Sequence, residues 1–298
     1  MQALTFKENH TNFYIGNLLS KIGNWTVFQA VDSNGFLGSI HIFKNEAINN
    51  KNNLSQEEDF YNYLDTSNQI IDPFNFNKEN LKITKIKWAS LADLLIQIQS
   101  FNSIISIESI GNKTYTGRIN MITSTSAYLD EQTEEYNLTE IPLKINYNKI
   151  VGVSANSIEN KLFNSWLLME NHPINQELVE LHFDYYDDSR FNTYYLGKII
   201  KEDENHLLFE SLNNLCQLDG ILLINKKHLI HTVHQSTELD YYQYLVNYHH
   251  KQSTFNPRNL KIDYPQSELK SAIKKQELVG IDNYAFDNTN IGVVTAFY

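Results

Sequence analysis

Two stretches of this chain of 298 residues repeat one pattern of aromatic, apolar and glycine residues. Tyr14–Leu19 (YIGNLL) matches Tyr195–Ile200 (YLGKII) at the shift of 181 positions that separates Gly16 from Gly197. The same shift, without a gap, places Asp59–Leu64 on Asp240–Leu245. An internal repeat limits the possible architectures more strongly than any local signal. The two stretches therefore predict two units of one fold, named A1 and A2 below.

A third unit, B1, precedes A2 by 80 positions. The aligned pairs are Gly117 with Gly197, Leu129 with Phe209, Ile141 with Ile221, Ile150 with Ile230 and Val153 with Val233. Few of these residues are identical, but their apolar character agrees. A fourth copy, B2, begins at Leu278–Asp282, which resembles Ile104–Glu108 at the start of B1. The sequence thus predicts a duplicated pair in the order A1-B1-A2-B2.

The B2 pattern contains only its first two strands, with Gly292 at the position of Gly197. Two strands alone would leave open edges and an uncovered apolar face. Three explanations remain open: a chain truncated at its C-terminus, a reduced terminal unit packed against its neighbour, or a unit completed by a partner's strand.

Each unit is predicted to contain five short strands. In A2, Val179–Phe183 alternates apolar and polar residues, and Gly220–Ile224 and Leu229–Val233 form a closing pair around a polar turn. The predicted fold is mainly β, with tandem five-stranded small barrels or bent sheets that each carry a short helix. The predicted segments are A1 at 1–66, a linker with a helix at 67–103, B1 at 104–170, A2 at 175–247, a second linker with a helix at 248–277, and the incomplete B2 at 278–298.

Local signals place three of the predicted helices. Ser55–Glu58 has the spacing of a capping box, and Thr237–Asp240 has a weaker form of the same signal in A2. Ser90–Gln99 carries apolar residues at helical spacing. These residues are Leu91, Leu94, Leu95 and Ile98.

The strand pattern resembles that of the Sm-like small β-barrel. In B1 the matching segments are Ile105–Glu108, Tyr115–Ile119, Tyr128–Asp130 and Ile150–Val153. The resemblance implies barrels that form rings or pair edge to edge, some of which bind RNA in the loops after the third strand and between the last two. The chain departs from the family in the last of these loops, at Asn146–Asn148 in B1 and Asn225–Lys227 in A2, which argues against RNA binding.

Composition narrows the function classes. The net charge of −11 opposes broad binding to phosphate, which depends on lysine and arginine. The single cysteine, Cys216, excludes an internal disulfide, and the first residues lack the pattern of a signal peptide. No apolar run approaches the roughly 18 residues of a membrane-spanning helix. We therefore expect a cytoplasmic protein that does not act at a membrane. Neither phosphate-binding glycine motif occurs, and no cofactor is expected.

Candidate catalytic and metal-binding residues each have a simpler interpretation. His228, His231 and His234 lie three apart, so a strand would direct neighbouring members to opposite faces, and no metal site is predicted. His249 and His250 adjoin a helix end, where cations interact favourably with the helix dipole.

Three further features could suggest catalysis. Asp184, Asp187 and Asp188 could act as an acid and base pair if buried, but a loop is expected to keep them solvated. Gly152–Asn156, with Ser154 at its centre, lacks the second glycine of a nucleophile elbow. Cys216 has apolar neighbours and is interpreted as a buried, unreactive thiol. No catalytic residue is predicted.

Two surface features could bind a macromolecule. The possible nucleic-acid strip consists of Lys78, Lys82, Lys85, Lys87 and Trp88. Its alternative interpretation is a strand whose apolar residues face inward. The possible protein-binding surface consists of Tyr61, Tyr63, Tyr241, Tyr242 and Tyr244. Packing of a helix on its own barrel would explain these tyrosines equally well.

These observations favour a non-enzymatic binding or scaffold protein whose tandem small β-barrels engage another protein or a second copy of the chain. The alternative is an Sm-like protein that binds RNA or single-stranded nucleic acid. An enzyme with a pocket between the two A-B pairs is the third possibility. The sequence does not identify a partner.

Overall fold

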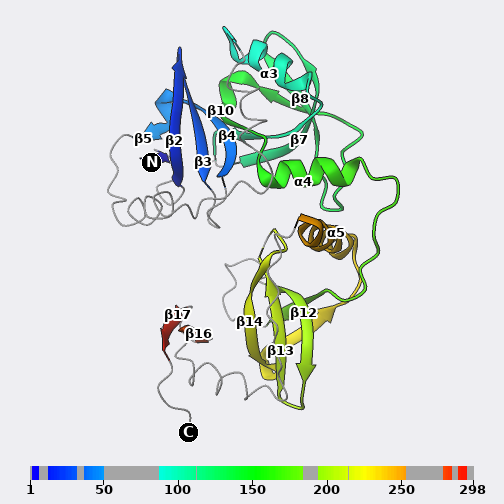
Figure 1. The fold of residues 1–298 in the computed structure, drawn as a ribbon. Coiled ribbons are helices and arrows are strands. Elements are labelled where there is room, and N and C mark those ends of the chain that lie inside the picture. The colour runs from blue at the N-terminus through cyan, green and yellow to red at the C-terminus, as the bar shows by residue number, and fades with distance from the viewer. Residues whose placement is uncertain are drawn as a thin grey trace. The chain divides into compact units, whose positions relative to one another are not determined.

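The computed structural model describes residues 2–6, 13–31, 37–49, 87–111, 113–183, 194–213, 215–252, 278–283 and 288–293. These residues form a mainly β structure, as predicted, and its sheets are antiparallel (Figure 1). The chain divides into two compact units, Met1–Glu170 and Asn171–Tyr298. The first unit contains the A1 and B1 segments, and the second contains A2 and B2. The finer boundaries remain predictions.

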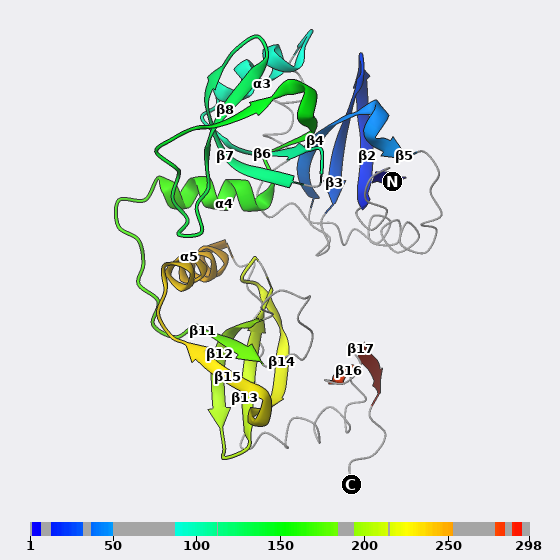
Figure 2. The same ribbon diagram turned by 180° about the vertical axis from the view of Figure 1, so that it is seen from behind.

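A single open sheet runs through the first unit (Figure 2). Its strands are β1 (Gln2–Phe6), β2 (Phe13–Ile22), β3 (Trp25–Val31), β4 (Leu37–Lys44), β5 (Ile48–Asn49), β6 (Ile104–Ser109), β7 (Lys113–Ile122), β8 (Ser126–Glu131), β9 (Leu143–Asn146) and β10 (Ile150–Ala155). Their order in the sheet is β5-β1-β2-β3-β4-β10-β6-β7-β8-β9. The pairing of β4 with β10 therefore joins the A1 strands to the B1 strands.

The second unit contains a five-stranded sheet and a separate pair of strands. The strands are β11 (Val179–Phe183), β12 (Tyr194–Glu202), β13 (His206–Leu212), β14 (Leu218–Asn225), β15 (Leu229–Val233), β16 (Leu278–Asn283) and β17 (Asn288–Val293). The order of the larger sheet is β14-β13-β12-β11-β15, and β16 pairs with β17. The observed β11 and β15 have the same bounds as the strands predicted at Val179–Phe183 and Leu229–Val233.

The same strand order occurs in A1, B1 and A2: fifth, first, second, third and fourth. In each, a short 3-10 helix connects the fourth strand to the fifth. These helices are η1 (Asn45–Ala47), η2 (Tyr147–Lys149) and η3 (Lys226–His228). The polar turn predicted between the closing strands therefore takes one form at all three places.

A glycine in each second strand allows the third strand to approach closely. A Cβ atom would lie 1.9 Å from the Gln29 carbonyl oxygen at Gly16, 2.1 Å from that of Asp130 at Gly117, and 1.9 Å from that of Glu210 at Gly197. No side chain fits at these distances. The glycines that defined the repeat in the sequence thus have one shared steric cause.

The strand registers correct the alignment of B1 with A2. Leu129 pairs with Leu143 in B1, whereas Phe209 pairs with Leu222 in A2, so the B1 loop is one residue longer. Ile141 is 84% exposed and lies outside β9, so its alignment with Ile221 was wrong. Corresponding residues of B1 and A2 are therefore 80 positions apart through the third strand and 79 positions apart afterwards. The counterparts of Ile150 and Val153 are consequently Leu229 and Thr232.

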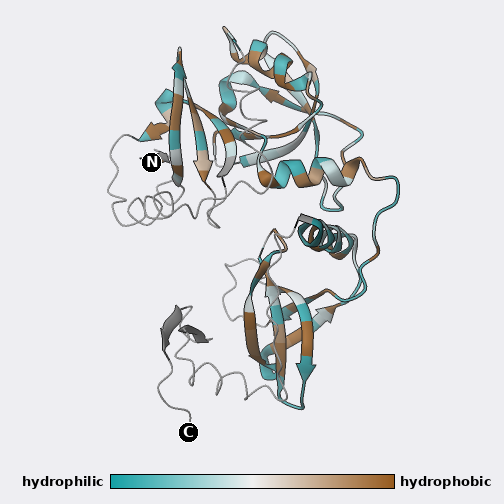
Figure 3. Cartoon of the chain, in the orientation of Figure 1, coloured by the Kyte–Doolittle hydropathy of each residue, from teal (hydrophilic) through white to brown (hydrophobic). Residues whose placement is uncertain are grey.

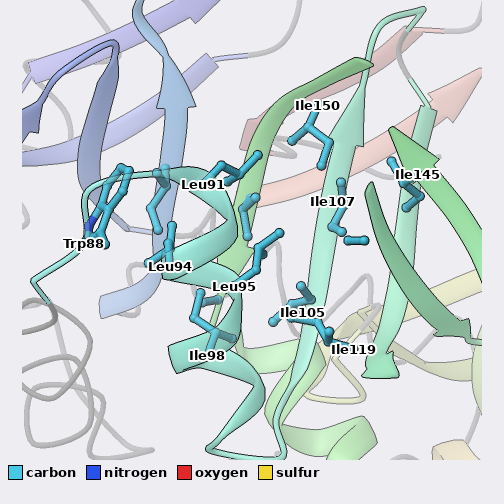
Figure 4. Close-up of a cluster of buried hydrophobic side chains, with 14 of the residues drawn as sticks. Trp88, Leu91, Leu94, Leu95, Ile98, Ile105, Ile107, Ile119, Ile145 and Ile150 are labelled. Carbon is cyan, nitrogen blue, oxygen red and sulfur yellow. The ribbon is translucent and has the colours of Figure 1, made fainter. Parts of the chain in front are cut away.

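A large core lies under helix α3 (Leu91–Gln99), whose position and buried face agree with the prediction. The Ser90 side chain caps this helix by accepting a hydrogen bond from the Asp93 amide. Figure 3 shows the alternation of polar and apolar residues along the strands, and Figure 4 shows the core side chains. These include Trp88, Leu91, Leu94, Leu95, Ile98, Ile105, Ile107, Ile119, Ile145 and Ile150. Ile40 and Ile42 of β4 belong to the same core, so A1 and B1 share it.

A helix follows the fifth strand in B1 and in A2. Helix α4 (Ile158–Leu167) is capped by Ser157. Helix α5 (Thr237–Gln252) begins where the sequence predicted, but its cap is Ser236, whose hydroxyl accepts a hydrogen bond from the Leu239 amide. The capping box predicted at Ser55–Glu58 in A1 lies outside the described residues. None of the helices in the described residues has the length and apolarity needed to cross a membrane.

Candidate functional site

A cavity of about 300 Å³ lies where β4 meets β10. The two strands pair His41 with Ser154 and Phe43 with Gly152. Gly152 leaves room for the ring of Phe43, because a Cβ atom there would lie 2.8 Å from a ring carbon. Polar groups from both halves of the first unit line the cavity. They include Tyr14, His41, Ser106, Glu108, Ser154 and Glu159.

His41 is held between two serine hydroxyls. Its Nδ1 lies 2.6 Å from the Ser154 Oγ, and its Nε2 lies 2.5 Å from the Ser39 Oγ. All three residues are buried. Burial lowers the pKa of His41 from 6.5 to about 3, so the imidazole is neutral near neutral pH. A neutral imidazole donates from one nitrogen and accepts at the other, which satisfies both serine contacts.

Glu108 and Tyr14 form the second polar pair of the cavity. The Tyr14 hydroxyl donates to the Glu108 Oε1 at 3.0 Å. Burial raises the pKa of Glu108, and the hydrogen bond from Tyr14 opposes this effect in part. Burial, together with the charge of Glu108 and its hydrogen bond, also raises the pKa of Tyr14. The Tyr14 ring lies against the imidazole of His41, with ring centroids 4.2 Å apart.

The pair of Ser154 and His41 resembles a nucleophile and its base only in distance. A general base works best when its pKa is near the operating pH, and His41 is far below it. The His41 nitrogens contact two serines, whereas Glu108 accepts from Tyr14. A carboxylate that orients the histidine, as in a catalytic triad, is therefore missing from the described residues. The arrangement suits binding and fixing of strand register better than acyl transfer.

A second polar cluster occurs in the sheet of the second unit. The Glu180 Oε2 lies 3.2 Å from the His182 Nε2, and the rings of His182 and His231 stack with centroids 4.3 Å apart. Tyr194 and Tyr242 both donate to the Glu238 carboxylate. Within the described ranges, no three His, Cys, Asp or Glu side chains are arranged to hold a metal ion.

The structure describes only two residues of the predicted nucleic-acid strip, and they differ in exposure. Lys78, Lys82 and Lys85 lie outside the described residues, and Lys87 is exposed. Trp88 is only 9% exposed and belongs to the core, where its ring meets Trp25 at a centroid distance of 6.5 Å. Trp88 therefore cannot stack on a base in this conformation. The alternative, a strand with inward-facing apolar residues, falls on residues outside the described ranges.

The predicted tyrosine surface is also not open. Tyr241, Tyr242 and Tyr244 are buried on α5, with Tyr241 in ring contact with the other two. Their assignment to an exposed protein-binding surface is wrong for this conformation, because aromatic residues on an amphipathic helix bury the most apolar area. Tyr61 and Tyr63 lie outside the described residues.

Cys216 and His249 are both buried in the second unit. Burial raises the pKa of Cys216, which agrees with the predicted unreactive thiol. The His249 Nε2 lies 2.7 Å from the Leu215 carbonyl oxygen, and burial lowers the pKa of His249. His249 is therefore neutral, and the predicted role as a cation at the helix end is wrong for it. Asp184, Asp187 and Asp188 lie outside the described residues.

Sequence reasoning singled out Ser154 but missed Tyr14, His41 and Glu108. Tyr14 belonged to the repeat, and nothing in the spacing of the other two connects them with Ser154. The pairing of β4 with β10 brings them together across more than a hundred positions of sequence. No family model, curated protein or solved structure matches this chain.

Proposed function

We propose that this protein is a non-enzymatic scaffold of tandem, Sm-like small β units, which binds another protein by adding strands at its open sheet edges. The observation that carries this proposal is the pairing of β4 with β10. There the fourth strand of one unit and the fifth strand of the next join two five-stranded sets into one sheet. The recurring strand order and the pairing of Gly292 with Val279, like that of Gly197 with Val179, support a repeat in the order A1-B1-A2-B2.

The A2 sheet has the same two edges without a neighbouring strand in the described residues. Ile42 on β4 is 1% exposed, whereas its counterpart Leu223 on β14 is 36% exposed. On the other edge, Val151 of β10 is half-buried, whereas its counterpart Ile230 of β15 is 60% exposed. Apolar residues at an unpaired edge favour addition of another strand. The second unit therefore has an exposed counterpart of each strand in the β4–β10 pair: β14 corresponds to β4, and β15 corresponds to β10.

A protein partner fits these edges better than a nucleic acid. Strand addition is driven by main-chain hydrogen bonds and burial of alternate side chains, and it needs no basic groups. The net charge of −11 and the burial of Trp88 give the nucleic-acid alternative no support. A second copy of the chain carries both edge types and is the simplest partner to test.

Light-scattering mass as a function of protein concentration tests the proposal. The wild-type chain is expected to self-associate, and Leu223→Lys is expected to reduce the association because it places a charge on the β14 edge. Ile96→Lys is the matched control, since Ile96 is 53% exposed on α3 and does not lie at a sheet edge. It should associate like the wild type.

A monomeric wild type would remove self-association. The proposal would then depend on binding of a peptide with the sequence 149–156, which contains β10 and already pairs with β4 in the chain. If Leu223→Lys does not weaken binding of this peptide, or if no binding occurs, the edge-docking function is wrong.

A further inference from the structure

The cavity between β4 and β10 contains negative charge and hydrogen-bond acceptors. Glu108 and Glu159 supply two carboxylates, and Ser106, Ser154 and Ser157 supply hydroxyl oxygens. Among the described residues that line the cavity, there is no lysine or arginine. The buried imidazole of His41 is neutral at neutral pH and does not compensate the carboxylates.

Glu108 is the group that most needs a cation. It is largely withdrawn from solvent, and its hydrogen-bond partner in the cavity is the neutral hydroxyl of Tyr14. A carboxylate that is removed from water is normally stabilised by a positive partner. Glu159, exposed at the first turn of α4, is close enough to Tyr14 to act on it electrostatically. Both carboxylates therefore line the same cavity.

Aromatic rings form another part of this site. The rings of Tyr14 and His41, which both line the cavity, have centroids 4.2 Å apart. A flat cation can contact such a wall while its edge donates hydrogen bonds. Guanidinium has this shape, and its five N–H donors in one plane match a carboxylate and neighbouring hydroxyl oxygens better than the point charge of an ammonium group.

We propose that the cavity binds a guanidinium group, with the Glu108 carboxylate as its charge partner and the serine hydroxyls as additional acceptors. The site is assembled from both A1 and B1, so it exists only where β4 and β10 are paired. This inference concerns a different surface from the open edges of β14 and β15. Its outcome is independent of whether those edges bind protein.

Calorimetric titration of the full chain with N-butylguanidinium tests the proposal, with N-butylurea as the neutral control of nearly the same shape. Saturable binding of the cation and none of the urea is expected. Equal binding of both compounds, or of neither, would show that charge does not govern the cavity. A blocked Gly-Arg-Gly peptide distinguishes the source of the group. Tighter binding of the peptide indicates an arginine side chain, and tighter binding of N-butylguanidinium indicates a small ligand.

Substitutions locate the site. Glu108→Gln should weaken binding of N-butylguanidinium by about tenfold or more, because it removes a charge-assisted hydrogen bond. Glu159→Gln, at an exposed position, should preserve the fold and weaken binding by a smaller factor. Glu134→Gln, exposed in the turn after β8 and outside the cavity, should have no effect. Undiminished binding by both cavity variants would place the ligand elsewhere and overturn the proposal.

Acidification gives a second readout. Glu108 shares its surroundings with Tyr14 from β2, His41 from β4 and Glu159 from α4. Protonation of Glu108 removes the charge that attracts the ligand, so affinity should fall as the pH is lowered through its raised pKa. Affinity that does not change on acidification would contradict the role of Glu108.

Discussion

One methyl group separates glycine from alanine, and Gly16, Gly117 and Gly197 have no space for it. The obstacle is in each case a carbonyl oxygen of the adjacent third strand, which cannot move aside as a flexible side chain could. By contrast, the Cβ of an alanine at Gly220 would meet no atom within 4 Å. The sequence shows the same residue at both kinds of position. Only the structure distinguishes the steric need from the incidental choice.

Gly197→Ala should therefore destabilise the second unit by about 3 kcal/mol or more, because the strands β12 and β13 must separate. Gly220→Ala, in β14 of the same sheet, should change stability by less than about 0.5 kcal/mol. Urea unfolding of the two variants measures the difference. Equal stability of the two proteins would show that the strand approach is not tight at Gly197.

Strands β4 and β10 are the elements that distinguish the first unit from the second. His41 of β4 occupies the register position of Leu143 in β9 and Leu222 in β14, as the pairing of the third and fourth strands shows. Among the three described fourth strands, histidine occupies this position only in β4, which pairs with the fifth strand of B1, β10. The strands β9 and β14 have leucine there. Buried polar pairs of this kind can fix one register among several. The serines on either side complete the interaction.

His41→Leu should reduce the acid sensitivity of the first unit. Folded His41 stays neutral down to a pKa of about 3, whereas the unfolded residue takes up a proton near pH 6.5. The unfolded state therefore binds more protons as the pH falls, and this residue costs about 1.4 kcal/mol of stability per pH unit in that interval. Unfolding curves across this range should show a shallower dependence in the variant.

Ser154→Ala is the comparison for this experiment. It removes a hydrogen bond worth about 1 kcal/mol but keeps the imidazole buried, so the pH dependence should persist. A wild type and a His41→Leu variant with the same slope would mean that the imidazole is already protonated or exposed in the folded state.

At the scale of the whole molecule, the chain contains two compact units that are expected to unfold separately. Leu95→Ala should destabilise the first unit by about 3 kcal/mol, since Leu95 is fully buried in the core beneath α3. Ile96→Ala, at the exposed neighbouring position, should change it by less than about 0.5 kcal/mol.

Hydrogen exchange resolved by peptide measures both units in one sample. Leu95→Ala should accelerate exchange in β6, β7 and β10 and leave β12 and β13 unchanged. Acceleration of similar size in all five strands would show that the two units unfold as one.

Local features were predictable from the sequence, and long-range contacts were not. Helix α3 followed from the helical spacing of Leu91, Leu94, Leu95 and Ile98, because this signal lies within one short segment. The strands of A2 followed from alternation and turn residues. The cavity depends on Tyr14, His41, Glu108 and Ser154, which are distant in sequence and meet through one strand pairing. The loop that is one residue longer in B1 escaped detection because the wrong alignment pairs identical residues. At a shift of 80, Ile141 falls on Ile221 and Ile150 falls on Ile230.

The pairing of β4 with β10 also has a consequence for synthesis of the chain. Ile42 leaves the ribosome well before Val153, its partner across the joint, and both side chains end in buried positions. At about 5 to 20 residues per second, an apolar strand edge stays unpaired for several seconds or more. During this interval the unpaired apolar strand β4 of the nascent chain is accessible to chaperones and to other nascent chains. Slowing translation should therefore increase co-translational aggregation until β10 has emerged.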